Sequence, residues 1–407
     1  MKNYLKKLSA LILALAMLFS LSACEDDPVN GYTGPWWTQT GGNSAHTGTL
    51  DTDGVELPSL SQLPAEVWKY QLKSALSIIN SSLLVVEDNI FFGTSDGKVI
   101  CMGDSTKKPY IKWTYQTENG ITNSLCYKDG VVYCGGYDGF LYAFNAEDGS
   151  LVWFKYLNSA IADAPVLVND TIVCGTLNGK VYSLKLENGT QIWDYSLTEG
   201  IATDIMYYDG GVEGGMVVFA AQDTYFHALN ATTGKALWSV STGTVNPQAP
   251  SAADGYVYLP SGEGIVYCVD AATGEKKWTF ETENNVYIVG YPAIKDGKVI
   301  VGSFDGMIYC LDAKTGEKLW EYDTYYRITS PATIAGSYVL FGASHPTAST
   351  EYLYCLNFYT GEFVWCAYSA TAIKVEPTVV NGAVYYTNNG GYIIKLSGEQ
   401  KLEDVTD

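Results

Sequence analysis

Short apolar runs of four to six residues recur along most of the chain, and turns that contain glycine separate them. The unit is clearest between residues 291 and 322, where four runs follow one another and the last contains Trp320. The three turns between these runs are Asp296-Gly297, Asp305-Gly306 and Thr315-Gly316. Because glycine adopts positive φ without steric cost, this punctuation predicts four antiparallel strands per unit. The runs are apolar at successive positions, which is typical of sheets that are covered on both faces.

Tryptophan gives the period of this unit. After Trp68, seven tryptophans follow at intervals of 40–45 residues: Trp113, Trp153, Trp193, Trp238, Trp278, Trp320 and Trp365. A four-stranded unit repeated at this interval is the blade of a β-propeller. One copy is too thin to bury its own faces, so the copies must stack on one another. The sequence therefore predicts an all-β fold.

The count of units indicates how the ring closes. Eight modules supply three strands each, and the last of them, residues 376–396, has no tryptophan strand after it. Trp68, in residues 65–71, precedes the first module and has no blade of its own. We therefore predict an eight-bladed propeller in which residues 65–71 complete the last blade, with seven blades as the alternative. Closure removes an open sheet edge, which is otherwise a site of aggregation.

A second pattern accompanies each tryptophan and identifies a family. It reads small-x-[DN]-x-x-[TN]-G-x-x-x-W, and a large residue at the small position is expected to block the indole of a neighbouring blade. The small residue stands ten positions before the tryptophan, or twelve for Cys101, and is Ala143, Ser183, Ala228, Cys268, Cys310 or Cys355. This pattern resembles the tryptophan-docking repeat of PQQ-binding-like (quinoprotein-type) eight-bladed propellers over residues 65–396. Residues 36–48, WWTQTGGNSAHTG, resemble the N-terminal segment of that family.

The N-terminus indicates export and lipidation. Three lysines precede an apolar run at residues 8–21, which is too short for a comfortable membrane span. The run ends in Leu-Ser-Ala-Cys, which resembles a bacterial lipobox and implies lipidation of Cys24. We expect a signal peptide at 1–23, a lipidated tether and N-terminal docking segment at 24–64, the propeller at 65–398 and a tail at 399–407. The alternative is an ordinary secretory signal with a chance cysteine.

Charge narrows the choice of partners. The formal net charge is −20 and becomes −23 once the three signal-peptide lysines are removed, while Arg327 is the only arginine. Such a surface repels nucleic acid, so no nucleic-acid partner is expected. The negative charge also has a simpler explanation, because it keeps an exported protein soluble.

The cysteines are expected to be small buried hydrophobes and not a disulfide framework. Cys101, Cys268, Cys310 and Cys355 occupy equivalent positions in different blades, and so do Cys134 and Cys174. Equivalent positions point the same way from separate sheets, which disfavours pairing. A disulfide bond between some of these cysteines remains an open alternative, because an even number of cysteines remains after Cys24.

The residues for catalysis are not recognisable in the sequence. Some quinoprotein propellers are dehydrogenases that hold pyrroloquinoline quinone and calcium over the central channel. This chain lacks their adjacent cysteine pair and their long insertions, and it offers a single arginine. The three histidines, His46, His227 and His345, have no metal-ligand spacing. We expect no enzyme activity, no cofactor and no metal, with a PQQ-dependent dehydrogenase as an alternative.

Binding is the function that remains. The loops that lead into each innermost strand gather at one mouth of the channel, and the candidate binding surface there comprises Asp163, Asp204, Gln248, Tyr287, Tyr291, Tyr325, Tyr326, Arg327 and Glu376. Exposed tyrosines are frequent at interfaces, although tyrosines in strands are also frequent here. Two loops, 209–216 and 342–352, are longer than their counterparts and are further candidates for a partner site.

The resemblance also suggests a role. The non-enzymatic relatives include lipoproteins of the BamB family, which implies a protein-interaction scaffold in the cell envelope. We expect a monomeric, lipid-anchored, extracytoplasmic protein with unidentified envelope proteins as partners. It would lie at the cell surface of a Gram-positive source or on the periplasmic face of a Gram-negative one. A receptor for a glycan or peptide is the alternative.

Overall fold

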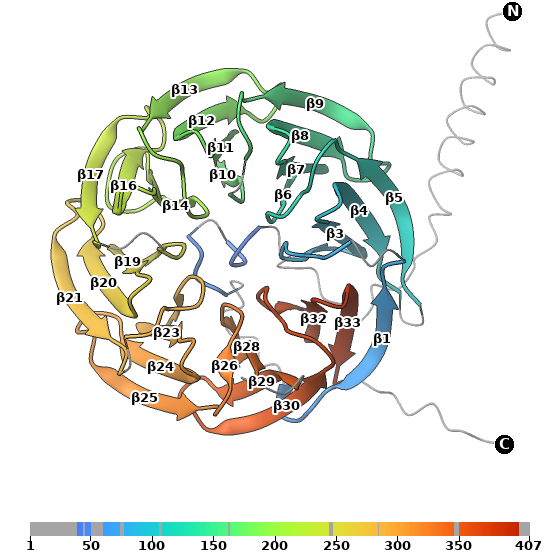
Figure 1. Cartoon of the computed structure of the whole chain (residues 1–407), viewed down its shortest axis with the longest axis vertical. Coiled ribbons are helices and arrows are strands. Elements are labelled where there is room, and N and C mark those ends of the chain that lie inside the picture. The colour runs from blue at the N-terminus through green and yellow to red at the C-terminus, as the bar shows by residue number, and fades with distance from the viewer. Residues whose placement is uncertain are drawn as a thin grey trace, which may run out of the picture. The chain divides into compact units, whose positions relative to one another are not determined.

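Eight antiparallel sheets surround a central channel in the computed structural model (Figure 1). The structure describes residues 39–43, 45–49, 60–73, 77–105, 108–161, 163–243, 247–283, 285–345 and 350–398, all within the unit Pro35–Asp407. The predicted signal peptide, Cys24 and the predicted tail lie outside the described residues. In the described part of the chain, no helix is long and apolar enough to cross a membrane.

The first four blades follow the chain from the inside of the ring outwards. Blade 1 contains β2 (Leu84–Val86), β3 (Asn89–Gly93), β4 (Lys98–Gly103) and β5 (Tyr110–Gln116). Blade 2 contains β6 (Cys126–Lys128), β7 (Val131–Gly135), β8 (Phe140–Asn145) and β9 (Leu151–Tyr156). Blade 3 contains β10 (Val166–Val168), β11 (Thr171–Gly175), β12 (Lys180–Lys185) and β13 (Gln191–Ser196). Blade 4 contains β14 (Met206–Tyr208), β15 (Met216–Ala220), β16 (Tyr225–Asn230) and β17 (Ala236–Ser241).

The other four blades complete the ring, and blade 7 has an additional short strand. Blade 5 contains β18 (Ser251–Ala253), β19 (Tyr256–Pro260), β20 (Ile265–Asp270) and β21 (Lys276–Glu281). Blade 6 contains β22 (Ala293–Lys295), β23 (Lys298–Gly302), β24 (Met307–Asp312) and β25 (Lys318–Asp323). Blade 7 contains β26 (Arg327–Ile328), β27 (Thr333–Ala335), β28 (Tyr338–Ser344), β29 (Glu351–Asn357) and β30 (Phe363–Ser369). Blade 8 contains β31 (Thr378–Val380), β32 (Ala383–Asn388), β33 (Tyr392–Ser397) and β1 (Ala65–Gln71).

The ring closes as the sequence predicts. β1 pairs antiparallel with β33, so that Trp68 lies opposite Lys395, and the sheet order of blade 8 is β1-β33-β32-β31. The earliest strand of the chain is therefore the outermost strand of the last blade (Figure 1). The prediction of eight blades is confirmed, and the alternative of seven is wrong.

Apolar packing between neighbouring blades holds the ring together. Each of eight clusters of buried residues lies at one junction, and the one that joins blades 8 and 1 contains Trp68, Tyr385, Phe92 and Met102. Both faces of each sheet are therefore buried, which explains why the strands are apolar at successive positions.

Each tryptophan reaches across a junction, as Trp320 illustrates. Its indole lies over Gly361 in the last turn of the next blade, because a Cβ built on that glycine would stand 2.6 Å from the indole Cε3. The indole N–H donates to the Phe358 carbonyl at 3.1 Å. Seven tryptophans bond a backbone carbonyl in this way at 2.7–3.1 Å, through the pairs Trp113–Ala146, Trp153–Leu186, Trp193–Ala231, Trp238–Ala271, Trp278–Ala313, Trp320–Phe358 and Trp365–Leu60.

The small residue of the repeat has a different role from the one predicted. Cys310 lies directly opposite Trp320 in the ladder between β24 and β25, so the two side chains share a face of the same blade. The expectation that the small residue makes room for an indole of a neighbouring blade is therefore wrong. A register shift follows this pair, and the same β-bulge accompanies the tryptophan in every blade. Such bulges re-aim a side chain.

The cysteines behave as small apolar residues. The eight described cysteines are free, and all except Cys366 are buried. Burial raises the pKa of the Cys268 and Cys310 thiols to about 12, which makes these thiols unreactive.

Candidate functional site

An N-terminal segment occupies the central channel. It comprises residues 39–49, of which Ser44 is not described, and we call it the channel segment (Figure 1). Its carbonyl groups accept hydrogen bonds from the innermost strands of three successive blades. Ala252 of β18 donates to Ala45, Ile294 of β22 to Thr47 and Ile334 of β27 to Gly48, at 2.7–3.0 Å.

His46 fixes this segment in place. Its Nδ1 lies 3.2 Å from the Pro250 carbonyl, and its own carbonyl accepts the Ser251 hydroxyl at 2.9 Å. The ring is 2% exposed, and burial lowers the pKa of His46 to about 4. The imidazole is therefore neutral at pH 7, and its contacts are those of a structural residue.

Polar residues three positions before an innermost strand hold the loops at the channel mouth. Ser81, Asp163, Thr203 and Ser330 each accept a backbone N–H from the strand that follows the innermost strand of their own blade, at its last residue in three blades and two residues earlier in blade 7. The four donors are Gly93, Gly175, Ala220 and Gly342, at 2.7–3.0 Å. Asp163, a predicted binding residue, therefore occupies a structural position that serine or threonine fills in three other blades.

Other predicted residues join neighbouring blades. Asp204 Oδ1 accepts the Ala164 backbone N–H at 2.8 Å, and Gln248 Oε1 accepts that of Gly290 at 3.2 Å. Glu376 Oε1 accepts the Ser82 hydroxyl in a short bond and the Gly41 backbone N–H at 3.4 Å. The contact with Gly41 ties the channel segment to blade 8.

Burial dominates the protonation of this inner group. It raises the pKa of Asp204 and Glu376, and it raises that of Asp163 well above its usual range, with the Asp204 charge adding to the effect on Asp163. Asp163 is 3% exposed, Tyr291 is 4% and Glu376 is 5%. These three side chains cannot belong to an exposed surface, although the sequence placed them in one.

The remaining predicted residues lie at the outer rim of the mouth, on blades 6 and 7. Tyr287 stacks on Phe304 with ring centroids 4.6 Å apart, and the Arg327 guanidinium lies 4.9 Å from the Phe304 ring centre. Tyr325 is 83% exposed and has φ +60°, which is unusual for a bulky residue. Tyr326 is half-buried and packs against Tyr352. This rim group, Tyr287, Tyr325, Tyr326 and Arg327, is the exposed part of the predicted surface.

The two long loops lie on opposite faces of the ring and cannot form one site. Residues 342–352 connect β28 and β29 on the mouth side, next to Tyr326. Residues 209–216 connect β14 and β15, a connection that lies on the other side in every blade. There Val212 packs against the core between blades 4 and 5, and the Tyr208 hydroxyl accepts the Gly255 N–H at 2.8 Å.

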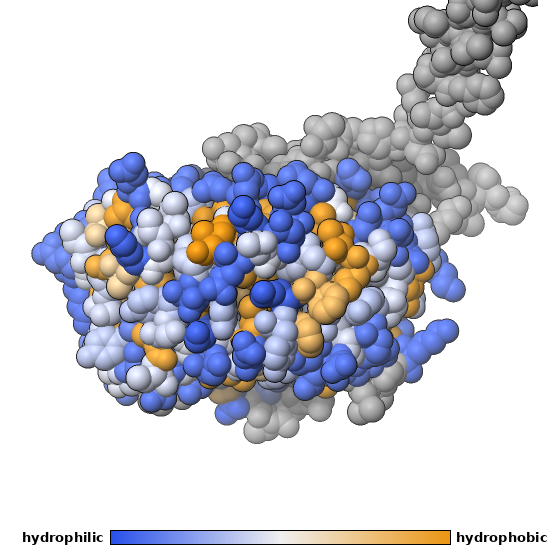
Figure 2. Space-filling view, turned by 90° about the horizontal axis from the view of Figure 1, so that it is seen from above, coloured by the Kyte–Doolittle hydropathy of each residue, from blue (hydrophilic) through white to orange (hydrophobic). Residues whose placement is uncertain are grey.

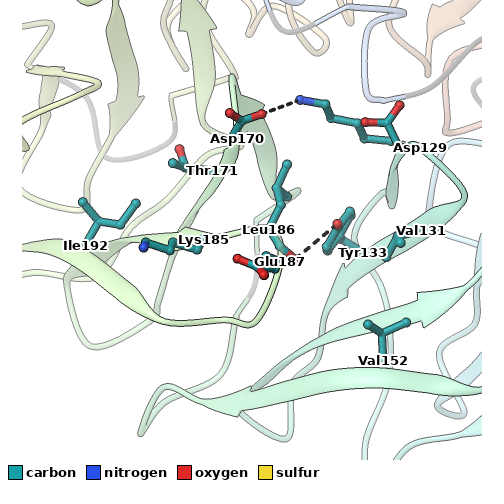
Figure 3. A pocket seen from close by; sticks show the side chains of 11 residues that line it. Asp129, Val131, Tyr133, Val152, Asp170, Thr171, Lys185, Leu186, Glu187 and Ile192 are labelled. Atoms are coloured by element: carbon teal, nitrogen blue, oxygen red, sulfur yellow. Dashed lines mark hydrogen bonds and ion pairs between the residues drawn. The ribbon is translucent and has the colours of Figure 1, made fainter.

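A groove that the sequence did not indicate opens between blades 2 and 3 (Figure 3). Its volume is about 550 Å³. The lining is apolar at its centre and charged at its edge, and comprises Lys128, Asp129, Val131, Tyr133, Val152, Asp170, Thr171, Lys185, Leu186, Glu187 and Ile192. Lys128 pairs with Asp170 at 3.4 Å, and the Tyr133 hydroxyl donates to the Leu186 carbonyl at 3.4 Å.

The channel does not suit a quinone with several carboxylates. The groups that converge there are Asp163, Asp204, Glu376 and the neutral His46, and none of them is a cation. The channel segment itself lies against β18, β22 and β27, whose N–H groups it accepts. Within the described ranges, no group of three His, Cys, Asp or Glu residues is arranged to hold a metal ion.

Comparison with known proteins gives the family. The family model described as outer membrane protein assembly factor BamB matches residues 62–206 and 222–349, which is more than half of the chain. The chain belongs to the BamB family. None of the curated proteins matches this sequence.

Solved structures share the fold of this BamB-family propeller at low sequence identity. BamB from Moraxella catarrhalis is 22% identical with a TM-score of 0.66, over 82% of this chain and 100% of that one. The designed protein Ika8 is 18% identical with a TM-score of 0.69, over 82% and 99%. The quinohemoprotein alcohol dehydrogenase ADHIIG from Pseudomonas putida HK5 is 14% identical with a TM-score of 0.71, over 91% and 82%. Dehydrogenases therefore share the ring, and their likeness extends to the fold alone.

Proposed function

We propose that this BamB-family propeller is a non-catalytic scaffold that docks other proteins of the cell envelope. The observation that carries the proposal is that the acidic groups in the channel are already hydrogen-bonded within the protein. Asp163, Asp204 and Glu376 are occupied in holding loops and blades together, and the channel segment is bonded to the innermost strands of blades 5, 6 and 7. The surfaces left for function are the mouth rim and the outer wall, which suit contacts with macromolecules.

The anchor belongs to the same proposal. The family description names the outer membrane, and Cys24 follows a run that resembles a lipobox. A lipid on Cys24 would hold the ring near a membrane through at least two acyl chains, since one chain binds only reversibly. In a Gram-positive source the same anchor would place the protein on the cell surface. We expect a monomer, because the net charge of −20 opposes self-association.

Cross-linking in intact cells tests the scaffold function. The full chain and a Cys24→Ala variant, each with a C-terminal tag, are cross-linked before lysis, purified under denaturing conditions and compared by quantitative mass spectrometry. We expect a small set of envelope proteins to be enriched in every replicate with the wild-type chain and to decrease with the unanchored variant. Enrichment of no protein above an untagged control contradicts the proposal.

A receptor for a glycan or peptide is the second candidate, and the rim group supports it. Tyr325 is held at positive φ and presents most of its surface, beside an arginine that stacks on Phe304. Strained residues of this kind concentrate at ligand sites. If the rim group binds a ligand, Tyr325→Ala weakens saturable binding, whereas Tyr359→Ala, which removes a tyrosine that is 49% exposed, leaves binding unchanged.

A further inference from the structure

The outer strand of blade 2 has an unusual edge. β9 pairs with β8 on one side only and is the last strand of its sheet. Three large residues of β9 are exposed at alternate positions: Val152 is 49% exposed, Phe154 57% and Tyr156 50%. An exposed, apolar edge strand is a template for pairing with another strand.

Two other outer strands carry a paired carboxylate at the position that Phe154 occupies in β9. The residue after the docking tryptophan is Phe154 in β9, whereas it is Asp194 in β13 and Glu321 in β25. Those carboxylates pair with Lys180 and Lys318, at 3.2 Å and 2.6 Å. Charged side chains on an edge strand oppose the addition of another strand. β9 has no charge at this position, and it carries three exposed large residues, more than any other outer strand in the described part of the chain.

One face of this edge carries an aromatic cluster, which comprises Phe140, Phe154 and Tyr156. Phe140 of β8 lies 5.7 Å from Phe154 and 5.0 Å from Tyr156, measured between ring centroids. Figure 2 views the wall of the ring from the side of blades 2 and 3, and apolar residues gather right of its centre, over the outer strand of blade 2. An exposed apolar patch rimmed by polar residues marks an interaction site.

The other face of the edge borders the groove between blades 2 and 3. Val152 of β9 lines that groove together with Ile192 of blade 3, and Tyr133 and Leu186 lie further in (Figure 3). Side chains of a strand point alternately to its two faces, but the β-bulge at Val152 turns this residue to the face opposite Phe154 and Tyr156. A strand added to β9 would therefore place one set of side chains on the aromatic cluster and the other set in the groove.

We propose that β9 is the docking edge for an extended segment of a partner protein, which it adds to blade 2 as a fifth strand. The inference rests on the proposed scaffold function and specifies the surface it uses. The backbone of β9 supplies the hydrogen bonds, and the aromatic cluster and the groove select apolar residues on both faces of the incoming segment. The matching partner has a run of apolar and β-branched residues.

The charges around the groove indicate which residues should flank the apolar run of the partner segment. The groove edge carries Asp129, Asp170 and Glu187 against Lys128 and Lys185, and Lys128 is already paired with Asp170. The whole chain is acidic as well, with a net charge of −20. A second copy of this chain brings the same negative charge and is disfavoured, whereas a segment with a lysine or arginine over the groove edge is attracted. We therefore assign the site to a basic-flanked apolar strand of a different protein.

A probe peptide tests the assignment on the full chain. The probe is a blocked nine-residue peptide of alternating valine and threonine with a lysine at each end, and its control has proline at the central position. We expect the probe to slow amide hydrogen exchange in residues 151–156, and the proline peptide to leave it unchanged. Protection of another outer strand, or no protection with the peptide in millimolar excess, overturns the proposal.

Matched variants distinguish binding at β9 from nonspecific hydrophobic binding to any outer strand. Val152 and Leu319 both precede a docking tryptophan and are similarly exposed, at 49% and 46%. We expect Val152→Lys and Phe154→Lys to weaken probe binding at least tenfold, and Leu319→Lys to leave it unchanged. Equal loss in all three variants overturns the proposal, and so does a wild-type dimer in sedimentation that Phe154→Lys disrupts. If cell cross-links find partners that contact only the mouth rim, the scaffold function stands and this inference fails.

Discussion

Trp68 and Asp104 join blade 8 to blade 1. The Trp68 indole N–H donates to Asp104 Oδ1 at 3.1 Å, whereas the other seven docking tryptophans bond backbone carbonyls. The same carboxylate accepts the Tyr385 hydroxyl at 2.6 Å and pairs with Lys395 at 2.7 Å. Three side chains of blade 8, one from the N-terminal strand β1 and two from the C-terminal strands β32 and β33, therefore converge on one residue of blade 1.

Asp104→Ala is expected to lower the free energy of unfolding by about 3–5 kcal/mol, because it leaves the Lys395 ammonium, on a side chain only 12% exposed, without its partner. Adding Lys395→Met removes that charge and should recover part of the loss. Chemical denaturation of the single and double variants measures both effects. A double variant less stable than Asp104→Ala would show that the ion pair is not the cause.

Gly316 tests the contact between indole and turn. A Cβ there would lie 2.6 Å from Trp278 Cε3 at φ +73°, whereas Gly297, at φ +67°, has no atom within 4 Å of the same position. Both glycine-to-alanine changes incur the cost of positive φ, and Gly316→Ala also overpacks the indole. We expect Gly316→Ala to be less stable than Gly297→Ala by about 1–3 kcal/mol. Equal denaturation midpoints would contradict the docking geometry.

Asp163 predicts a dependence of stability on pH. The pKa of the Asp163 carboxyl is higher in the folded protein than in the unfolded chain. The protonated carboxyl therefore stabilises the fold fully at pH values below the unfolded pKa. This stabilisation is lost as the pH rises through the folded pKa. Asp163→Asn keeps an acceptor for the Gly175 N–H without the charge. The variant should therefore melt at a higher temperature than wild type at pH 7.5, by about 2 °C per kcal/mol. The difference should shrink at pH 4.5, and a difference independent of pH would refute this role.

Gly48 tests how closely the channel segment packs against Ala293 and Ala332 of the ring. A Cβ on Gly48 would lie 2.7 Å from the Ala293 Cβ and 2.9 Å from the Ala332 carbonyl oxygen, whereas Gly243, at a similar positive φ, has open space. We expect Gly48→Ala to expose residues 39–49 and to raise their rate of limited proteolysis on the order of tenfold, and Gly243→Ala to leave that rate unchanged. Unchanged proteolysis of Gly48→Ala would show that the segment does not need this close approach.

The sequence predicts the fold well because the fold depends on side chains that repeat. Glycine at the turns and Trp320 with its equivalents specify strand number, blade number and closure. The channel segment was not predictable in detail, because its bonds to Ala252, Ile294 and Ile334 use backbone groups that any residue supplies. Asp104 lies in the one turn before a tryptophan strand that departs from the repeat, and in the sequence only the longer spacing between Cys101 and Trp113 indicated this.

The candidate site was predicted only in part, for a similar reason. The sequence places Asp163 and Tyr325 at the same mouth, but it does not say that one is 3% exposed and the other 83%. Ser81, Thr203 and Ser330, which stand three positions before the innermost strands of three other blades, could have shown that Asp163 is structural. The groove beside Val152 depends on how two blades are spaced, and no single position records that spacing.

The scaffold function is tested most directly by photo-cross-linking in living cells. A photoreactive amino acid is placed singly at position 154 on the blade 2 edge, at 325 on the mouth rim and at 319 on the wall of blade 6. The account predicts a discrete adduct of defined mass with an envelope protein from position 154, and none from 319. No adduct from any position, or the same mixture from all three, would contradict it.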